Sequence, residues 1–250
     1  HFELYSAFAL MDPDNSLPNS EFHNATYAGP FGWDPNSKND LRFTVRHIAV
    51  SGGQPNAIAL YGIADEGQQK EQDNYYGATW NNQTTDKWHN VLRYGGLRQN
   101  SEFNEFGATG IYDPAIGYWL GAPVTITGAN GYSVSGQAIF QYSDQPSQYL
   151  SSSRRDFAYV QSDYSVTPHL LALGAFKFER ESGSAGDAGS TPSSIERDNY
   201  SYTLQLTGDI RNRLFWNLGT GLEDNGLFGF AATPRASLAY YLVRPSDRGF

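Results

Sequence analysis

The serines of residues 131–136 are the part of the sequence most similar to a catalytic nucleophile. The segment reads Gly131-Tyr-Ser-Val-Ser-Gly136. A nucleophile elbow follows the pattern Gly-x-Ser-x-Gly at a turn between a strand and a helix, because that sharp turn exposes the serine hydroxyl. Here Ser135 occupies the position of the second glycine, and no helical pattern follows. The sequence therefore predicts no catalytic serine and a protein that is not an enzyme.

Histidines and acidic residues, which are common metal ligands, are dispersed along the chain. His23, His47, His89 and His169 form no His-x-x-x-His pair, and the chain has no cysteine, so the spacing of a zinc site is missing. The run Asp12-Pro-Asp-Asn could offer oxygen ligands to calcium, but it lacks the spacing and the glycine of an EF-hand loop. We expect no metal ion and no cofactor, and calcium binding by this run stays open.

A pair of carboxylates across a cleft can hydrolyse glycosidic bonds. The acidic residues of the expected loops are far apart in the chain: Asp12, Asp14, Glu66, Glu102, Glu105 and Asp113. Their separation in space does not follow from the sequence. A soluble secreted all-β domain that binds or hydrolyses carbohydrate therefore stays as one alternative.

The longest expected connection, residues 98–153, is rich in aromatic residues. Loops of more than about 15 residues usually bind a ligand, gate a site or are disordered. Tyr112, Tyr118 and Trp119 could stack on a ligand, and they are the candidates for ligand contact. The alternative is internal packing of the loop, with a hairpin through residues 124–127 and 132–139.

Composition limits the kind of protein. The chain has 250 residues, a formal net charge of -9 and 15% aromatic residues, and its mean hydropathy is below zero. No window approaches the roughly 18 consecutive apolar residues of a membrane-spanning helix, whereas a strand of a membrane barrel needs an apolar residue only at alternate positions. Clusters of lysine and arginine are also missing, which argues against a nucleic-acid partner.

Apolar and polar residues alternate in many segments. In residues 199–208, for example, Tyr200, Tyr202, Leu204 and Leu206 alternate with polar residues, which is typical of a strand with one apolar face. The sequence predicts about ten such strands: residues 2–10, 25–33, 41–50, 74–81, 87–97, 154–166, 169–180, 199–208, 213–222 and 230–242. The predicted fold is all-β, an antiparallel up-and-down meander.

Connections between these strands alternate between short and long. The short ones are residues 34–39, 82–86, 167–168 and 209–212, and the long ones are residues 12–23, 51–70, 98–153 and 181–196. Outer-membrane barrels have short periplasmic turns at one end and long extracellular loops at the other. The alternation therefore favours a transmembrane β-barrel.

Tryptophans concentrate near the short turns. Trp33, Trp80, Trp88 and Trp216 all lie within a few residues of such a turn, and Tyr240 lies at an equivalent strand end. Aromatic residues form girdles where barrels meet the membrane interface. We expect these five residues to form such a girdle, although aromatic residues are also good strand formers.

Several segments resemble a known family. Residues 225–242 read NGLFGFAATPRASLAYYL, which resembles the barrel of TonB-dependent outer-membrane receptors, where a Thr-Pro-Arg-x-Ser-Leu-x-Tyr strand follows an outer loop. Residues 12–29, which contain NSLPNSEFHNATYAG, and residues 128–136, GANGYSVSG, are similar to segments of the cobalamin- and siderophore-receptor branch. The resemblance covers essentially the whole chain.

The resemblance implies a barrel of about 22 strands, closed by an N-terminal plug, that takes up a scarce ligand such as a siderophore or cobalamin with energy relayed by TonB. We expect residues 1–250 to be part of that barrel domain without the plug, truncated at both ends. TonB would then act only through the missing N-terminal region. The expected location is the bacterial outer membrane, with membrane lipid and a small-molecule ligand at the extracellular loops as partners. A passive porin-like channel is the other alternative, and the sequence identifies neither the ligand nor the oligomeric state.

Overall fold

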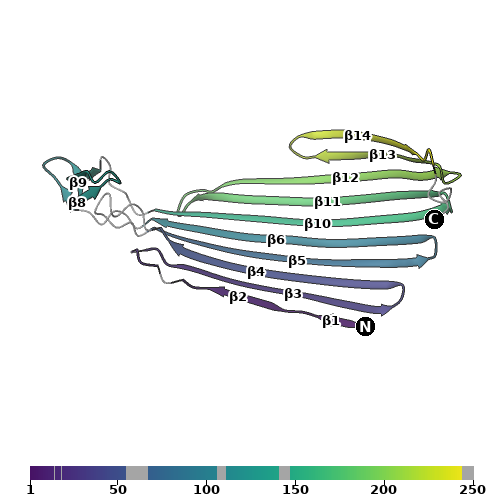
Figure 1. The fold of residues 1–250 in the computed structure, drawn as a ribbon, viewed down its shortest axis with the longest axis horizontal. Coiled ribbons are helices and arrows are strands. Elements are labelled where there is room, and N and C mark those ends of the chain that lie inside the picture. The colour runs from purple at the N-terminus through teal and green to yellow at the C-terminus, as the bar shows by residue number, and fades with distance from the viewer. Residues whose placement is uncertain (14, 18, 55–66, 106–110, 141–146, 244–250) are drawn as a thin grey trace.

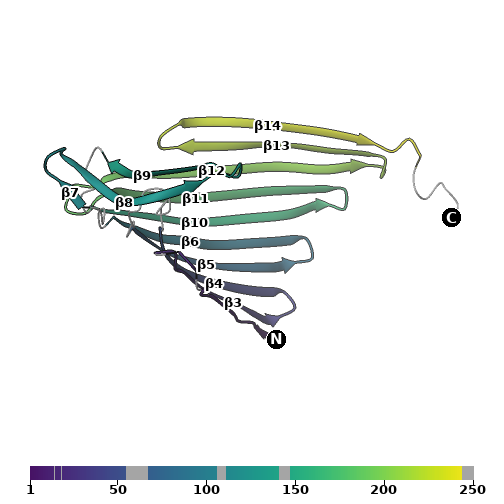
Figure 2. The ribbon, with the colours of Figure 1, turned by 60° about the vertical axis from the view of Figure 1, so that its left-hand side comes forward.

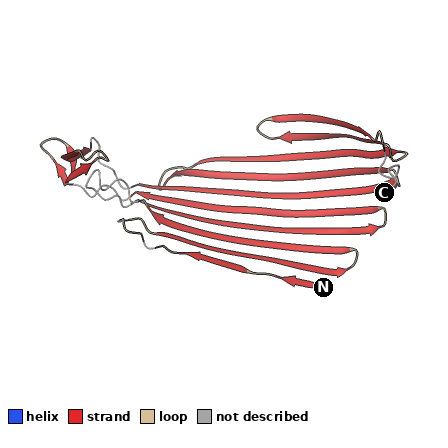
Figure 3. Cartoon of the chain, viewed as in Figure 1, coloured by secondary structure: helices blue, strands red, loops and turns tan. Residues whose placement is uncertain are grey.

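Strands make up most of the described part of the chain (Figures 1 and 3). The computed structural model describes residues 1–13, 15–17, 19–54, 67–105, 111–140 and 147–243. The strands are β1 (Phe2–Leu4), β2 (Ala7–Met11), β3 (Phe22–Asn36), β4 (Asn39–Gly53), β5 (Gln68–Thr85), β6 (Trp88–Glu105), β7 (Ile111–Asp113), β8 (Tyr118–Thr127), β9 (Ser133–Phe140), β10 (Ser147–Thr167), β11 (Leu170–Asp187), β12 (Ser193–Ile210), β13 (Leu214–Asn225) and β14 (Gly229–Tyr240). Within these described ranges, no helix has the length and apolar character needed to cross a membrane.

Eleven of these strands form one antiparallel sheet. Its order is β1-β3-β4-β5-β6-β10-β11-β12-β13-β14, and β2 also pairs with β3. From β3 to β14 each strand therefore lies beside its neighbour in the chain, except that β7, β8 and β9 are inserted between β6 and β10. The predicted all-β antiparallel meander is confirmed. The edge formed by β1 and β2 does not pair with β14, so the described sheet is open, and Figure 2 shows its strands turning steadily from β3 to β14.

The structure extends the strands beyond their alternating segments. β10 and β11 stay paired from Tyr149 opposite Asp187 to Thr167 opposite Leu170. The predicted long connection over residues 181–196 is wrong, because β11 continues to Asp187 and β12 begins at Ser193. Backbone hydrogen bonds hold a strand pair together whatever the side chains, so a strand that is polar on both faces shows no alternation in its sequence.

The short connections lie together at one end of the sheet (Figure 1). The turn between β12 and β13 has positive φ at two residues that are not glycine, 56° at Arg211 and 52° at Asn212. Its backbone closes through a 3.1 Å hydrogen bond from Arg213 N to Ile210 O. Positive φ at both central residues is the geometry of the hairpin turns that match the twist of a sheet.

The residues between β6 and β10 form a second, small sheet. Its order is β7-β8-β9, and it lies at the end of the main sheet opposite the short turns (Figure 1). β8 and β9 pair from Thr127 opposite Ser133 to Val124 opposite Gly136. The alternative of a hairpin through residues 124–127 and 132–139 is confirmed.

Candidate membrane and ligand surfaces

The strand register divides the main sheet into two chemically different faces. Residues directly opposite each other on paired strands point to the same face. Leu204 lies opposite Gly174 and Thr220, and following such pairs across the sheet defines the apolar face. It includes Tyr27, Phe31, Phe43, Tyr76, Leu170, Phe176, Tyr200, Tyr202, Leu204, Leu218 and Leu238.

The apolar face is uncovered. Leu204 is 59% exposed, Leu218 52% and Leu238 72%, and Val91 is the one buried hydrophobic residue among those described. Because these side chains are exposed, no second sheet of the described residues packs on this face. A soluble sandwich would bury these side chains between two sheets. An exposed apolar surface of this extent instead suits contact with lipid.

The apolar face is nearly as tall as the lipid-facing band of an outer-membrane barrel. On β10 it runs from Tyr164 through Val160 and Ala158 and ends at Asp156. That stretch is about 26 Å of strand at 3.3 Å per residue. Strands of outer-membrane barrels are tilted by about 40°, so this stretch gives a height of about 20 Å, somewhat below the roughly 25 Å of the lipid-facing band of such barrels.

The aromatic residues predicted as a girdle lie on the apolar face at its short-turn end. Trp33 and Trp80 flank Leu41 on neighbouring strands. Trp88 lies opposite Tyr164. On the last two strands, Trp216 lies opposite Leu238 and Tyr240 lies opposite Leu214. Two of the indole groups donate hydrogen bonds, from Trp80 Nε1 to Asn39 Oδ1 at 2.9 Å and from Trp88 Nε1 to Ser162 Oγ at 2.7 Å. Each of these two rings thus has an apolar body and a bonded polar edge, as interfacial aromatics do.

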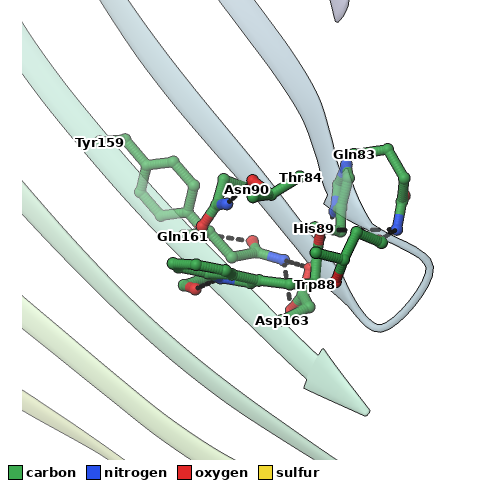
Figure 4. A network of polar contacts seen from close by, with 10 residues as sticks. Gln83, Thr84, Trp88, His89, Asn90, Tyr159, Gln161 and Asp163 are labelled. Carbon is green, nitrogen blue, oxygen red and sulfur yellow. Dashed lines mark hydrogen bonds and ion pairs between the residues drawn. The ribbon is translucent and has the colours of Figure 1, made fainter. Parts of the chain in front are cut away.

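Close to Trp88, polar side chains at the short-turn end of β6 and β10 form a network of hydrogen bonds (Figure 4). On the opposite face of the same strands, Asp163 accepts hydrogen bonds from Gln161 Nε2 at 2.9 and 3.0 Å. His89 Nδ1 lies 3.2 Å from Asp163 Oδ2, and Tyr159 donates to Gln161. These contacts link β6 and β10 just inside the turn, where the sheet meets water.

Aromatic rings lie directly on glycines at three places. A Cβ atom added to Gly208 would be 2.6 Å from the ring of Trp216, and one added to Gly96 would be 2.5 Å from the ring of Tyr76. On the other face, one added to Gly95 would be 2.6 Å from the ring of Phe157. Glycine leaves a backbone surface on which a neighbouring ring can rest, so these glycines allow the rings to lie flat along the sheet.

The second face, which we call the polar face, carries a network of charges. Glu179 is 5% exposed, and it accepts contacts from Arg155 Nη2 at 2.6 Å and Lys177 Nζ at 2.7 Å. Arg155 also lies 3.1 Å from Glu181, which accepts a 2.6 Å hydrogen bond from Arg197 Nε. A buried carboxylate persists when it is paired and hydrogen-bonded, and Glu179 meets both conditions.

Two hollows lie mainly on the polar face, as expected for the concave side of a curved sheet. A hollow of 560 Å³ is lined mostly by polar-face residues, including Arg93, Arg155, Phe157 and Tyr159. A second hollow is lined by Arg155, Arg197 and the exposed tip of the β13–β14 hairpin, including Phe228. In a barrel the concave face would line the lumen. Polar lumen and apolar exterior are the arrangement of outer-membrane barrels.

At the end of the apolar face that is farther from the short turns, the apolar side chains are replaced by charged side chains that form ion pairs. Arg98 Nη2 lies 2.9 and 2.7 Å from the two carboxylate oxygens of Asp156, which also accepts hydrogen bonds from Tyr76 at 2.9 Å and Tyr94 at 3.0 Å. Farther along the border, Arg180 and Asp198 form two parallel contacts of 2.7 Å. We call this border the outer polar band.

Two carboxylates outside the apolar stretch are held in their ionised form. The side-chain hydrogen bond from His169 and the backbone amide of Asn212 lower the pKa of Asp209 at the short turns. Hydrogen bonds from Asn104 and Gln148 lower the pKa of Glu102 beyond the outer polar band. Both groups accept bonds that only the charged form makes well.

The three candidate ligand-contact residues come together in the small sheet. Tyr112 lies opposite Trp119, and Asp113 lies opposite Tyr118. Tyr112 is half exposed. The fold thus brings the backbones of these residues into one pair of strands, while their contact with a ligand stays a prediction.

Residues considered for other chemistry lie in unrelated places. Ser133 is in β9 with its hydroxyl 2.7 Å from that of Thr127, not at a turn between a strand and a helix. Asp12 pairs with His23 at 2.6 Å, whereas Asp14 and Glu66 fall outside the described residues. The residues that are described contain no group of three potential metal ligands. His89 and His169 each contact one aspartate.

The charge network was missed by sequence reasoning. Lys177, Glu179 and Glu181 alternate along β11, so a charged face was visible. Their partners Arg155 and Arg197 lie on the two neighbouring strands, and only the register brings them together. A pattern within one strand cannot reveal a contact that depends on two.

Comparison with known proteins places the fold among outer-membrane barrels. No family model and no curated protein sequence matches the chain. Among solved structures, it is similar to the siderophore receptor PirA from Acinetobacter baumannii, with a TM-score of 0.56 and 11% identity over 96% of this chain and 36% of that chain. It is also similar to BauA, the ferric preacinetobactin receptor of the same organism, with a TM-score of 0.52 and 10% identity over 95% of this chain and 39% of that one. The chain thus spans less than half the length of either receptor, and it has the fold of part of a receptor-like outer-membrane barrel.

Proposed function

We propose that this chain is part of the barrel wall of a TonB-dependent receptor, which takes up a scarce small molecule such as a siderophore or cobalamin across the bacterial outer membrane. The observation that carries the proposal is the single-layer meander with an uncovered apolar face nearly as tall as the lipid-facing band of such barrels and with strands that continue beyond it. The fold shared with two siderophore receptors supports the same conclusion. The parent barrel would hold a plug, through which TonB acts.

In this proposal the parts of the sheet have separate roles. The apolar face contacts membrane lipid, and the Trp-rich short turns lie at the periplasmic rim. The small sheet with Tyr112, Tyr118 and Trp119 lies on the extracellular side, where a ligand arrives first. The charged polar face lines the lumen and is available to a plug or a passing ligand.

Uptake by intact cells tests the proposal. Cells that produce the full-length protein would be compared with cells lacking it for uptake of labelled ferric siderophores and cobalamin, each in the presence and absence of TonB. We expect saturable uptake of at least one compound that is lost without TonB. Uptake that does not saturate and persists without TonB would instead identify a porin-like channel, and a protein absent from the outer-membrane fraction would rule out both.

A further inference from the structure

The end of β12 that is farther from the short turns has a neighbouring strand on one side only. β12 stays paired with β11 as far as Ser193 opposite Ala185, whereas its pairing with β13 ends at Asn199 opposite Asn225. The hairpin of β13 and β14 turns back at that point, and Figure 1 shows β12 continuing past its tip. Within the described part of the chain, residues 193–197 of β12 therefore form a free strand edge.

The hydrogen bond at the hairpin tip identifies which backbone groups face this edge. Gly226 N donates to Asp198 O at 2.9 Å, so Asp198 faces the side of β13. In an antiparallel strand the N–H and C=O of one residue point to the same side, and successive residues point to opposite sides. Ser194 and Glu196 therefore direct their N–H and C=O groups to the free edge. Among the described residues, no hydrogen bond uses any of these groups.

Apolar side chains gather beside the free edge. Ile195 lies between the two unpaired residues and is 60% exposed, and Leu227 and Phe228 at the hairpin tip are 51% and 81% exposed. All three line one hollow of 540 Å³, together with Arg155 and Arg197. Residues directly opposite each other on paired strands point to the same face. A residue placed opposite Ile195 would therefore direct its side chain to this hollow.

We propose that this edge binds an extended peptide of another molecule, which adds a strand antiparallel to β12. The spacing of the unpaired groups carries the inference. Ser194 and Glu196 are about 6.6 Å apart along the strand, and another extended backbone presents donors and acceptors with the same repeat. One apolar side chain of the peptide fills the hollow between Ile195 and Phe228. A peptide differs in class from a siderophore or cobalamin, so the inference goes beyond the proposed uptake and does not require it.

Peptides with methylated backbone nitrogens test the pairing. The full-length protein in detergent micelles would be titrated against fluorescein-labelled Thr-Thr-Thr-Val-Thr-Thr, with binding read from fluorescence anisotropy. When the valine lies opposite Ile195, the N–H groups of the two flanking threonines point to β12 and that of the valine points away. We expect saturable binding that N-methylation of either flanking threonine weakens about tenfold, as loss of one hydrogen bond can. N-methylation of the valine should change the affinity little.

A proline in the edge tests the same contact from the side of the protein. Glu196→Pro removes one unpaired N–H but no bond to β11, and proline is tolerated at strand edges. It should weaken peptide binding about tenfold, whereas Glu196→Gln, which keeps the N–H, should bind as wild type does. Heat-dependent gel mobility would verify that both variants are folded, and the methylated peptides need no variant at all.

Three results would overturn the proposal. Absence of saturable binding would show that another segment covers the edge in the full-length protein. Equal effects of N-methylation at the valine and at the threonines would show that the peptide does not pair with β12. Equal affinity of Glu196→Pro and wild type would lead to the same conclusion. None of these measurements depends on the uptake assay.

Discussion

The indole ring of Trp216 lies on the backbone of Gly208, its direct partner across β12 and β13. A Cβ atom at Gly208 would be 2.6 Å from the ring and 3.0 Å from the carbonyl oxygen of His169. Gly208→Val must therefore displace Trp216, and we expect it to destabilise the folded protein in lipid vesicles by about 1 to 3 kcal/mol, as overpacking does. Urea unfolding followed by tryptophan fluorescence measures this. Gly174→Ala is the control, because its nearest atom would be 3.9 Å away; equal loss in both variants would contradict the role of the ring.

The assignment of the two faces gives a second prediction. Leu204→Arg puts a charge on the apolar face and should cost about 2 to 4 kcal/mol if the residue lies near the midplane of the membrane. Gln205→Arg, one residue along the same strand but on the polar face, should cost much less. The folded fraction in vesicles, read from heat-dependent gel mobility, compares the two. If Gln205→Arg is the more harmful change, the faces are reversed.

The buried carboxylate of the polar face gives a third prediction. Glu179→Ala removes the shared partner of Arg155 and Lys177. Because Arg155 is half exposed and keeps Glu181, we expect a loss of stability of about 1 to 3 kcal/mol, below the cost of breaking a fully buried pair. The double variant Glu179→Ala/Arg155→Ala should lose less stability than the sum of the losses measured for the two single variants. Strict additivity would show that the pair does not interact.

The lowered pKa of Asp209 predicts that the protein loses stability in acid. Its pKa in the folded protein is lowered from the usual 3.8, first by the hydrogen bond from His169 and then by the Asn212 amide. A lowered pKa contributes stability that is fully present above the unfolded value and is lost as pH falls through the folded value. The free energy of unfolding should therefore decrease less between about pH 5 and pH 2 for Asp209→Asn than for wild type. An unchanged slope would show that this carboxylate does not stabilise the turn.

The small sheet gives a prediction for ligand binding. Tyr118→Ala and Trp119→Ala should weaken ligand binding to intact cells, and loss of one aromatic anchor can cost at least about 2 kcal/mol. Surface expression would be measured for each variant, and Trp216→Ala at the short-turn end serves as the matched change. Normal display with unchanged affinity in both loop variants would show that these aromatic residues only pack within their sheet.

Sequence alone predicted the faces of the strands better than their lengths. Alternation in residues 199–208 correctly placed Tyr200, Tyr202, Leu204 and Leu206 on one face. In the proposed placement, lipid on one side and polar surroundings on the other would select opposite residue types at successive positions. Beyond the proposed membrane segment both faces of a strand would meet water, so this selection would end while backbone pairing continues. For that reason the extension of β11 and β12 over residues 181–196 left no pattern to recognise.

The contacts between strands were also beyond sequence reasoning. The register of the strands decides which side chains contact each other, as for Trp216 with Gly208 and for Arg155 with Glu179. No residue type in these pairs indicates such a contact by itself. A shift of one residue would move every side chain to the other face. The hairpin of β8 and β9 was predictable because its alternating residues flank a turn that contains Gly131.

The continuation of β10 past Asp156 to Ser147 adds about 30 Å of paired strand between the proposed lipid boundary and the end that leads to the small sheet. Electrostatic fields in physiological salt decay over about 8 Å. With the strands tilted as in other barrels, the height gained is still several decay lengths. Anionic headgroups would therefore exert little attraction or repulsion on a solute that reaches Tyr112 and Tyr118. The rate of that encounter should depend on the charge of the small sheet itself and change little when the lipid composition is altered.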